Sequence, residues 1–567
     1  MKKLSLLFVT ASVVACGGVE APRNVSSDPF CQRVIPAVDA WLADARTAHP
    51  TPDDDRYGGT VVVGTNGEIA DGMNAAVAAD YNATQHHQFV NLMTLIDFDD
   101  EYRPQGYLAE SWEFAEDMTS VTFRIRQDVF WHDGEQTDAH DVAFTYRTVT
   151  DPETAFPNAA FWSHYVPGED GVEVLDDFTL RIRMRPHSMP LDPFRTVGIL
   201  PEHLLGDVPR SELKQHPFGS QCPVGNGPFV FYSHTAQDRW VFEANPAFPE
   251  ELGGRPFVNR YVYRAIPEQT TLLAELLTGG IDVYVQPTPE QAQNVLDAEQ
   301  LDLRRFVGRS YMYVGWNSRL PKLSDARVRT ALGMGVDRQS LVDGTLGGYG
   351  RIANSGVPPF HVAFDADLES PVSYDPAGAR ALLEEAGWVD RNGDGVRENA
   401  AGEPLEIVLK YNPHHLRQAI AEVMQAQLAE VGVVITPQSV EFTTLIDQIA
   451  STRRDFEGVV MGWNAEFRLD DTDLFRSDRI DQPYAFSGTQ NSTIDRLIDA
   501  LSTTVDEDVS RALWIEYQRA IMEEQPYTYF YFRDRLVGVN RRLQGVEMDV
   551  RGEWTTLKDW YIDPASP

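Results

Sequence analysis

The sequence has few cysteines and few basic residues for its length. Of 567 residues, three are Cys, and 48 Lys and Arg stand against 85 Asp and Glu, a formal net charge of -37. Nucleic acids and anionic membrane surfaces require basic patches, so we expect neither as a partner. We interpret the acidic excess as a solvated surface.

Long apolar runs are scarce as well. The stretch from Leu4 to Ala15 follows Lys2 and Lys3 and is shorter than the roughly 20 residues that a membrane-spanning helix needs. It is typical of a signal peptide, and its end, Val13-Val14-Ala15-Cys16, resembles a bacterial lipobox. We expect residues 1–16 to be a lipoprotein signal segment with Cys16 lipidated. The alternative is an ordinary secreted protein in which Cys16 is incidental.

Residues 17–56 are expected to form a tether and an N-terminal extension. From Gly17 to about Pro29 the chain is small and polar, and as a flexible coil it reaches on the order of 20 Å. The two thiols that remain after Cys16 are Cys31 and Cys222. In an exported protein such a pair is expected to form a disulfide; the alternative is two buried cysteines without a bond.

Sequence motifs of catalysis are absent. The chain has no Gly-x-Ser-x-Gly, His-Glu-x-x-His or Cys-x-x-Cys segment and no phosphate-binding Walker sequence. We therefore expect no enzyme activity and no cofactor. Because 85 carboxylates offer many acid pairs, a secreted hydrolase stays as the alternative from a different class.

Three groups of histidines and acids invite a metal interpretation, and we expect none to be a metal site. His132, Asp133 and Glu135 surround an Asp-Gly turn pair, which satisfies its own backbone. The adjacent pairs His86-His87 and His414-His415 project in different directions and are expected to be exposed or capping residues.

The segment 390–398 has oxygen-bearing residues at alternate positions. Gly395 occupies the sixth position of a calcium loop, but the twelfth position is Ala401 where such loops carry a bidentate Glu. An Asx-rich surface turn is the preferred interpretation, and calcium binding is the alternative.

The stretch from Leu108 to Tyr146 is the most informative part of the chain. It runs through Leu108-Ala-Glu-Ser-Trp, Thr122-Phe-Arg-Ile-Arg, Val129-Phe-Trp-His-Asp-Gly-Glu and Asp138-Ala-His-Asp-Val-Ala-Phe. The alternation predicts a strand, and Thr137 or Asp138 can cap a following helix. These residues resemble the signature of the family 5 solute-binding proteins, the peptide, nickel and oligosaccharide receptors of ABC importers. The resemblance implies a binding protein and not an enzyme.

Three later segments carry the same resemblance into both halves of the chain. They are Gly225-Asn-Gly-Pro-Phe-Val, the helical stretch 270–279 followed by Gly279-Gly280-Ile281-Asp282-Val283, and the block from Ser324 to Arg338.

The C-terminal half predicts a parallel sheet from its own residues. Asp375-Pro376 begins a helix that Gly387 ends, and 405–411 is a strand. Apolar residues at helical spacing from Leu416 to Leu428 then lead to a strand at 433–435. This β-α-β order predicts a three-layer lobe with parallel pairing, in which Met424 and Leu428 are core residues.

Together these observations predict an α/β protein. A chain beyond about 300 residues usually divides into domains, and the resemblance implies a two-lobe, periplasmic-binding-protein-like fold of the Venus flytrap kind (type II, cluster C) with an extra subdomain on lobe 1. We expect residues 57–80, 225–306 and 526–567 to form lobe 1, residues 81–224 the extra subdomain, and residues 307–525 lobe 2.

The function implied by the resemblance is that of a monomeric, lipid-anchored receptor in the cell envelope, at the periplasmic or outer face of the cytoplasmic membrane. It would capture a short peptide and deliver it to ABC permease and ATPase subunits. An oligosaccharide or another solute is the alternative ligand.

One segment is expected to bind the ligand directly. In peptide receptors of this family an acidic residue shortly after a Gly-Trp pair binds the peptide α-ammonium. Here Gly462-Trp463-Asn464-Ala465-Glu466 supplies the same order with Glu in place of Asp, so Trp463, Asn464 and Glu466 are the candidate ligand-binding residues. The alternative is a core Trp463 and a solvated Glu466. The family's nearby arginine is not seen, because Val459 and Val460 occupy that stretch.

Overall fold

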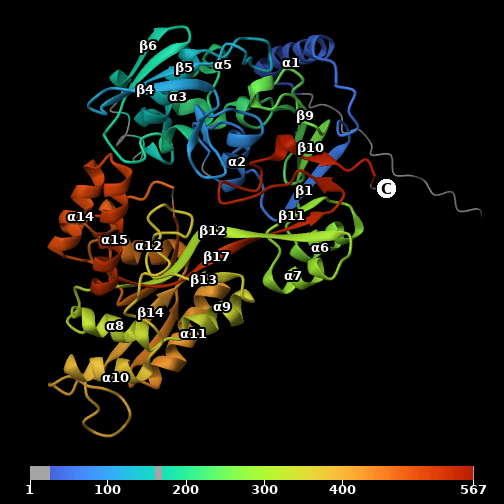
Figure 1. Cartoon of the computed structure of the whole chain (residues 1–567). Helices are drawn as coiled ribbons and strands as arrows, with labels where there is room; N and C mark the ends of the chain where they lie inside the picture. The colour runs from blue at the N-terminus through green and yellow to red at the C-terminus, as the bar shows by residue number, and fades with distance from the viewer. Residues whose placement is uncertain are drawn as a thin grey trace, which may run out of the picture.

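Two long strands run through the whole molecule. β12 (Leu301–Trp316) and β17 (Tyr527–Asn540) pair antiparallel over most of their length, and they run side by side between two groups of helices and strands (Figure 1). They join both groups into one sheet of order β15-β14-β16-β12-β17-β11-β1-β10-β9-β8, with β13 also paired to β17. Two lobes therefore share a single sheet.

The computed structural model describes residues 26–565 except 79, 160, 161, 163–165, 167, 168 and 466. The expected signal segment with Cys16 lies outside these residues, and so does Glu466. Among the helices of the described residues, none has the length and apolar character needed to cross a membrane.

Lobe 1 is built on one end of the sheet. Its strands are β1 (Thr60–Thr65), β8 (Phe229–Thr235), β9 (Arg239–Ala244), β10 (Arg260–Ala265) and β11 (Val283–Val285), and its helices are α2 (Tyr81–Phe89), α6 (Gln269–Thr278) and α7 (Pro289–Leu296). The chain ends in this lobe with β18 (Leu543–Gln544) and β19 (Tyr561–Ile562). Aromatic residues such as Tyr261, Trp554 and Trp560 fill its core.

Lobe 2 has helices on both faces of its sheet. The strands are β13 (Gly350–Ile352), β14 (Glu406–Tyr411), β15 (Val434–Ser439) and β16 (Gly458–Asn464). Helices α8 (Ala326–Met334), α9 (Arg338–Leu346), α10 (Pro376–Glu385) and α11 (His415–Ala429) share one core, and α12 (Phe442–Ala450), α14 (Ser492–Thr503) and α15 (Glu507–Glu524), with the short α13 (Thr472–Phe475), share the other. Alternate residues of β12 divide between these cores, as strand geometry requires.

The predictions for the C-terminal half are confirmed. The Asp375 side chain accepts a hydrogen bond from the Gly378 N–H at 2.9 Å and so caps α10. β14 pairs parallel with both β15 and β16. Met424 and Leu428 are fully buried, which gives the expected three-layer lobe.

A four-stranded unit stands apart from the main sheet. It contains β4 (Ala109–Phe114), β5 (Ser120–Ile125), β6 (Val172–Asp176) and β7 (Thr179–Arg183) in the order β4-β5-β7-β6, with α1 (Pro29–Ala48), α3 (Ala139–Thr150), α5 (Glu202–Leu205) and the short pair β2 (Ile96–Phe98) and β3 (Pro104–Gly106) nearby. These elements share one core, to which α1 contributes Val34, Val38 and Leu42. Cys31 in α1 and Cys222 form a disulfide with a Cα–Cα distance of 5.5 Å.

The segments that carry the family resemblance hold distant parts of the chain together. The His132 N–H donates to the Gly225 carbonyl at 2.7 Å, and its Nε2 lies 3.0 Å from the Gly227 carbonyl oxygen. A Cβ at position 225 would lie 1.7 Å from the Asn91 carbonyl oxygen, so only glycine fits there. The buried Arg329 donates to the Gln525 carbonyl at 2.9 Å and ties α8 to the start of β17.

The lobe boundaries differ in detail from those expected. In β17, Phe530 and Tyr531 pack in a lobe 2 core, whereas Val537 and Val539 pack in the lobe 1 core. The chain thus crosses between lobes within β17 and not at residue 526. In the same way α2, expected in the subdomain of residues 81–224, contributes Ala83 and Phe89 to the lobe 1 core.

Lobe 2 also touches the four-stranded unit, and the most buried aromatic contact between them is made by Phe467, which we call the Phe467 clasp. Phe467 is 3% exposed, and Arg195 places its guanidinium carbon 4.0 Å from the centre of the ring. Arg195 is held by the buried Asp192 at 2.8 Å. Tyr102 and Phe98 also contact the Phe467 ring, with distances of 5.9 and 6.0 Å between ring centres. The clasp joins surfaces that no strand connects.

Replacing Phe467 by Ala should loosen the contact between lobe 2 and the four-stranded unit. Removal of a buried Phe side chain costs on the order of 3 kcal/mol, and here most of that loss falls on the contact between lobe 2 and the four-stranded unit. Small-angle X-ray scattering should report a larger radius of gyration for Phe467→Ala than for wild type. The control is Phe442→Ala, at a side chain that is 48% exposed. Scattering curves of Phe467→Ala and wild type that superimpose would contradict the role of the clasp.

Candidate functional site

A cavity of about 520 Å³ opens where the two long strands cross between the lobes. Its volume lies in the range of small-ligand sites. Lobe 1 lines it with Thr65, Asn66, Tyr81, Asn82, Gln269, Val285, Gln286, Pro287, Thr288, Pro289 and Glu290, lobe 2 with Thr345, Leu346, Tyr349, His415 and Asn464, and the crossing strands with Phe306, Val307, Gly308, Arg309, Ser310, Arg533, Asp534, Arg535 and Leu536, beside Val550. Because both lobes contribute walls, a ligand here would contact both.

An irregular step in the pairing of β12 and β17 shapes the cavity floor. Val307 pairs with Asp534 and Tyr311 with Phe532, so three residues of β12 stand opposite Arg533 alone. Such a bulge bends the strand and turns side chains out of the ladder. A Cβ on Gly308 would lie 2.4 Å from the Arg533 carbonyl oxygen. Glycine at 308 therefore permits the bulge that presents Arg309 and Arg533 to the cavity.

A buried polar network forms the lobe 1 side of the floor. The Tyr81 hydroxyl donates to Glu553 at 2.6 Å, and Arg535 Nε donates to the same carboxylate at 2.7 Å. The Arg535 guanidinium also lies 4.7 Å from the centre of the Tyr81 ring. Burial and the negative charge of Glu553 raise the pKa of Tyr81 well above its usual value, so the hydroxyl stays protonated. The network fixes Tyr81 and Arg535 at the cavity wall.

The predicted segment 463–466 reaches this cavity in part. Asn464 lines it and pairs with Ser310 of the bulge. Trp463 is not among the lining residues; it is 40% exposed, not core, and contacts Tyr484 edge-on at 5.9 Å between ring centres. Glu466 lies outside the described residues. Its neighbour Ala465 donates its N–H to the Arg309 carbonyl at 2.9 Å.

The adjacent pair His86 and His87 has a structural role in lobe 1. His86 and His87 are buried, contrary to the expectation that they are exposed or capping, because they hydrogen-bond within lobe 1 to Tyr261 at 2.9 Å and to the Gly72 carbonyl at 3.0 Å. Burial lowers the pKa of His86 to about 3 and that of His87 to about 4. Both are neutral core residues at physiological pH.

The calcium-like segment is a turn that uses its own oxygens. Asp390 accepts from the N–H groups of Gly393 at 2.7 Å and Gly395 at 3.0 Å, and Asp394 accepts from Val396 at 2.8 Å. These are the contacts of an Asx turn. Across the residues described, no three His, Cys, Asp or Glu side chains converge as metal ligands would.

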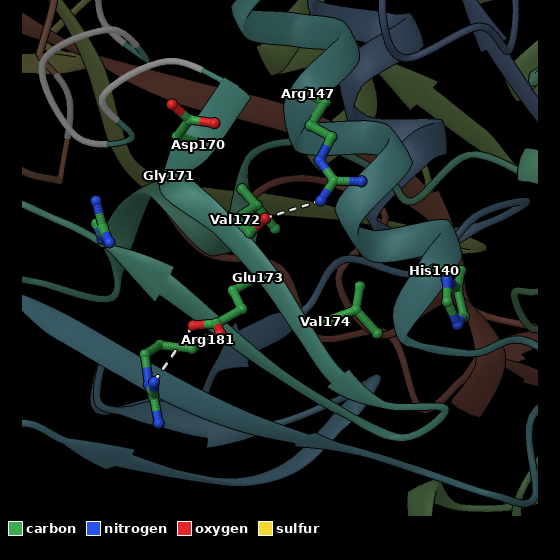
Figure 2. Close-up of a pocket in the computed structure, with 9 residues that line it drawn as sticks. His140, Arg147, Asp170, Gly171, Val172, Glu173, Val174 and Arg181 are labelled. Carbon is green, nitrogen blue, oxygen red and sulfur yellow. Dashed lines mark hydrogen bonds and ion pairs between the residues drawn. The ribbon is translucent and has the colours of Figure 1, made fainter.

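A second hollow, of about 790 Å³, lies on the four-stranded unit between α3 and β6 (Figure 2). Two of its three arginines have partners: Arg147 donates to the Val172 carbonyl at 2.9 Å, and Arg181 pairs with Glu173 at 3.3 Å. All of its lining residues belong to one unit. No motion between lobes could close it, so the cavity at the strand crossing is the better candidate.

Sequence reasoning did not identify most of this site. Tyr81, Arg309 and the two β17 residues Arg533 and Arg535 come from three distant parts of the sequence and meet only where β12 pairs with β17 between the lobes. One sequence pattern could have indicated the bulge in β12: Gly308 stands between two stretches of β-type residues, which is typical of a bulge.

Comparison with known proteins identifies the family. Residues 103–479, more than half of the chain, match the model of the bacterial extracellular solute-binding proteins, family 5. The chain is 28% identical over 515 residues to the oligopeptide-binding protein AppA of Bacillus subtilis, covering 89% of this chain and 92% of AppA. It is 26% identical over 401 residues to the periplasmic oligopeptide-binding protein OppA of Haemophilus influenzae, covering 66% and 70%.

Solved structures agree with this result. The structure of Bacillus subtilis AppA in complex with a nonapeptide has a TM-score of 0.72 and 27% identity, covering 89% of this chain and 99% of that one. NikA of Brucella suis in complex with Fe(III)-EDTA, at 20% identity and a TM-score of 0.75 over 89% of this chain and 100% of that one, shares the fold. The chain belongs to the bacterial extracellular solute-binding proteins of family 5.

Proposed function

We propose that this protein is the substrate-binding component of an ABC importer and captures a short peptide in the cavity between its lobes. The observation that carries the proposal is a cavity walled by both lobes and floored by the two strands that connect them. The similarity to AppA, solved with a nonapeptide, favours a peptide as the ligand. An oligosaccharide or another solute is the alternative.

Closure of the lobes is the physical event in this function. A ligand shifts an open-to-closed equilibrium only by the difference in its affinity for the two states. Contacts with Tyr81 and Arg535 on one side and Asn464 and His415 on the other are available together only when the lobes are close. The bulge at Gly308 lies between these walls, and we assign the hinge to it.

A screen of ligands by thermal shift tests the proposal. We expect members of a short-peptide library to raise the melting temperature of the purified protein, because a ligand at 100 times its Kd adds about 2.7 kcal/mol to the stability of the folded state. Cello- and xylo-oligosaccharides serve as the comparison. A clear shift with the oligosaccharides and none with any peptide would overturn the peptide assignment.

The residues expected to hold the peptide N-terminus are Glu466 and Asn464. Asn464 lines the cavity, and the Ala465 backbone is fixed to cavity-lining Arg309. A buried ammonium must be paired, and a charge-assisted hydrogen bond contributes about 1.5 to 3 kcal/mol. We propose that the Glu466 carboxylate makes this pair. The proposal that Trp463 walls the same cleft has less support, because this side chain does not line the cavity.

Glu466→Gln should weaken the binding of peptides with a free amino terminus by about tenfold or more, which corresponds to about 1.4 kcal/mol. The variant keeps the shape of the side chain and removes its charge. Isothermal titration calorimetry should find that N-acetylated peptides bind poorly to the wild type and to the variant. Equal wild-type affinities for free and acetylated peptides would remove Glu466 from this role.

The partners and the place of action follow from the same proposal. The protein would act as a monomer in the cell envelope and deliver its ligand to two permease and two ATPase subunits. Cys16, at the end of the lipobox-like segment, would carry the lipid that keeps it at the membrane. One acyl chain gives only weak membrane binding, so a stable anchor requires more than one chain on this residue.

Cys16→Ala should release the protein from membranes. Without the lipid, nothing in the described residues resembles a membrane-spanning helix, so the variant should move to the soluble fraction after a salt wash while the wild type stays with the membrane. Immunoblots of the two fractions measure this. A Cys16→Ala protein that stays wholly membrane-bound after the wash would contradict the lipid anchor.

A further inference from the structure

The acidic residues that line the cavity already have partners. Asp534 accepts a hydrogen bond from Arg305 Nε at 2.6 Å, and Arg351 lies 3.7 Å from its other oxygen. At Glu290, a hydrogen bond with its own backbone and one with Thr288 lower the pKa of the carboxyl. The Asp534 carboxylate is therefore not available to Arg533. The Glu290 carboxylate also interacts electrostatically with His415 of lobe 2 and not with Arg533.

Arg533 differs from the other charged groups around the cavity. Arg535 on the same face of β17 is paired with Glu553, and Arg309 contacts Phe467. Arg533 is half-buried and lines the cavity, and the described part of the chain offers its side chain no hydrogen bond or ion pair. The groups that act on its pKa besides burial, which lowers it, are Tyr531 and Arg535. No carboxylate is among them.

Further basic residues of lobe 2 lie near one another, and His414 is close enough to Arg533 for the two to interact electrostatically. Burial, together with the neighbouring His415, Arg417 and Arg533, lowers the pKa of His414 to about 4, so its ring is neutral at physiological pH. The rings of His414 and His415 stack at 4.9 Å between centres. Arg417 donates to Asn412, and its buried Nε has no hydrogen-bond partner among the described residues. We call these four residues the basic cluster.

The basic cluster is unusual in a chain of this composition. Acidic residues outnumber basic ones by 85 to 48, and most partly buried arginines here are paired with a carboxylate, as Arg126, Arg195 and Arg535 are. Arg533 is half-buried beside the positive charge of Arg535, which repels it, and burial removes part of its hydration. An anion that enters the cavity would relieve both costs. The net negative field of the protein does not attract such a ligand, so its recognition depends on these local groups.

We propose that Arg533, supported by the basic cluster, binds a carboxylate of the peptide ligand, so that the receptor prefers peptides with an anionic group at this position. The inference rests on the proposed peptide-binding function and adds a class of ligand to it. A guanidinium recognises a carboxylate by two parallel hydrogen bonds.

Two parts of a peptide carry a carboxylate: its C-terminus and the side chains of Asp and Glu. Both present the same planar group to Arg533. Alanine pentapeptides with a single Glu or Gln at each of the five positions, each made as a free acid and as a C-terminal amide, separate the two sources.

Calorimetry with these peptides and the purified full-length protein tests the inference. Wild type should bind the anionic member of at least one matched pair, Glu against Gln or acid against amide, about tenfold or more tightly. Arg533→Gln should remove that preference while affinity for the neutral member changes less than about threefold. Arg533→Lys, which keeps the charge and loses the planar fork, should retain part of the preference. A preference confined to the acid and amide pairs assigns the carboxylate to the C-terminus; one confined to a Glu position assigns it to a side chain.

Arg304→Gln is the matched control. Arg304 lies on β12 outside the cavity, with its side chain 49% exposed. The substitution therefore removes the same charge from a neighbouring strand and should leave the preference unchanged. Wild-type binding without preference in any pair would contradict the role of Arg533 and leave peptide binding intact. An Arg533→Gln protein that retains the full preference would also contradict it. No binding of any pentapeptide would contradict the proposed function itself.

Discussion

The pairing of β12 with β17 is the constraint on which the rest of this structure depends. A ladder of main-chain hydrogen bonds crosses from one lobe to the other, so the lobes cannot move independently except where the ladder is irregular. Its larger irregularity is at residues 308–310, opposite Arg533, and a smaller register shift follows between Met312 and Tyr313. The same irregularity that leaves backbone groups out of the ladder turns side chains into the cavity. The proposed hinge and the proposed binding site are therefore located at the same residues, and a change that regularised the strands would be expected to affect both.

Local patterns in the sequence predicted the regular part of lobe 2. The ends of α10 were predictable because capping and positive φ depend on single residues, here Asp375-Pro376 and Gly387. The helix α11 was predictable because the apolar spacing from Leu416 to Leu428 is that of one helix face. The extent of β12 was not predictable in this way. Its residues 301–310 are a mixture of polar, charged and apolar types, and their strand conformation depends on the partner strand β17, more than 200 residues later in the chain.

The family resemblance located part of the site and left the rest unseen. Its segments mark positions where backbones approach closely, as at Gly225, or where a buried arginine binds carbonyls, as at Arg329. These positions determine the fold and do not contact the cavity. The residues that line the cavity, such as Tyr81 and Arg533, are not constrained by backbone geometry, so no general pattern reveals them. Asn464 was identified because it directly follows the Gly462-Trp463 pair that carries the resemblance, at the end of β16.

The disulfide between Cys31 and Cys222 gives the two lobes unequal mechanical roles. It fastens α1 to the four-stranded unit, whose core α1 also shares, so the N-terminal end of the described chain is covalently held to that unit. A force applied at this end is carried by the bond and not by the hinge. If the N-terminal end is held in place, the four-stranded unit stays with it, and lobe 2 is the part that moves about the proposed hinge.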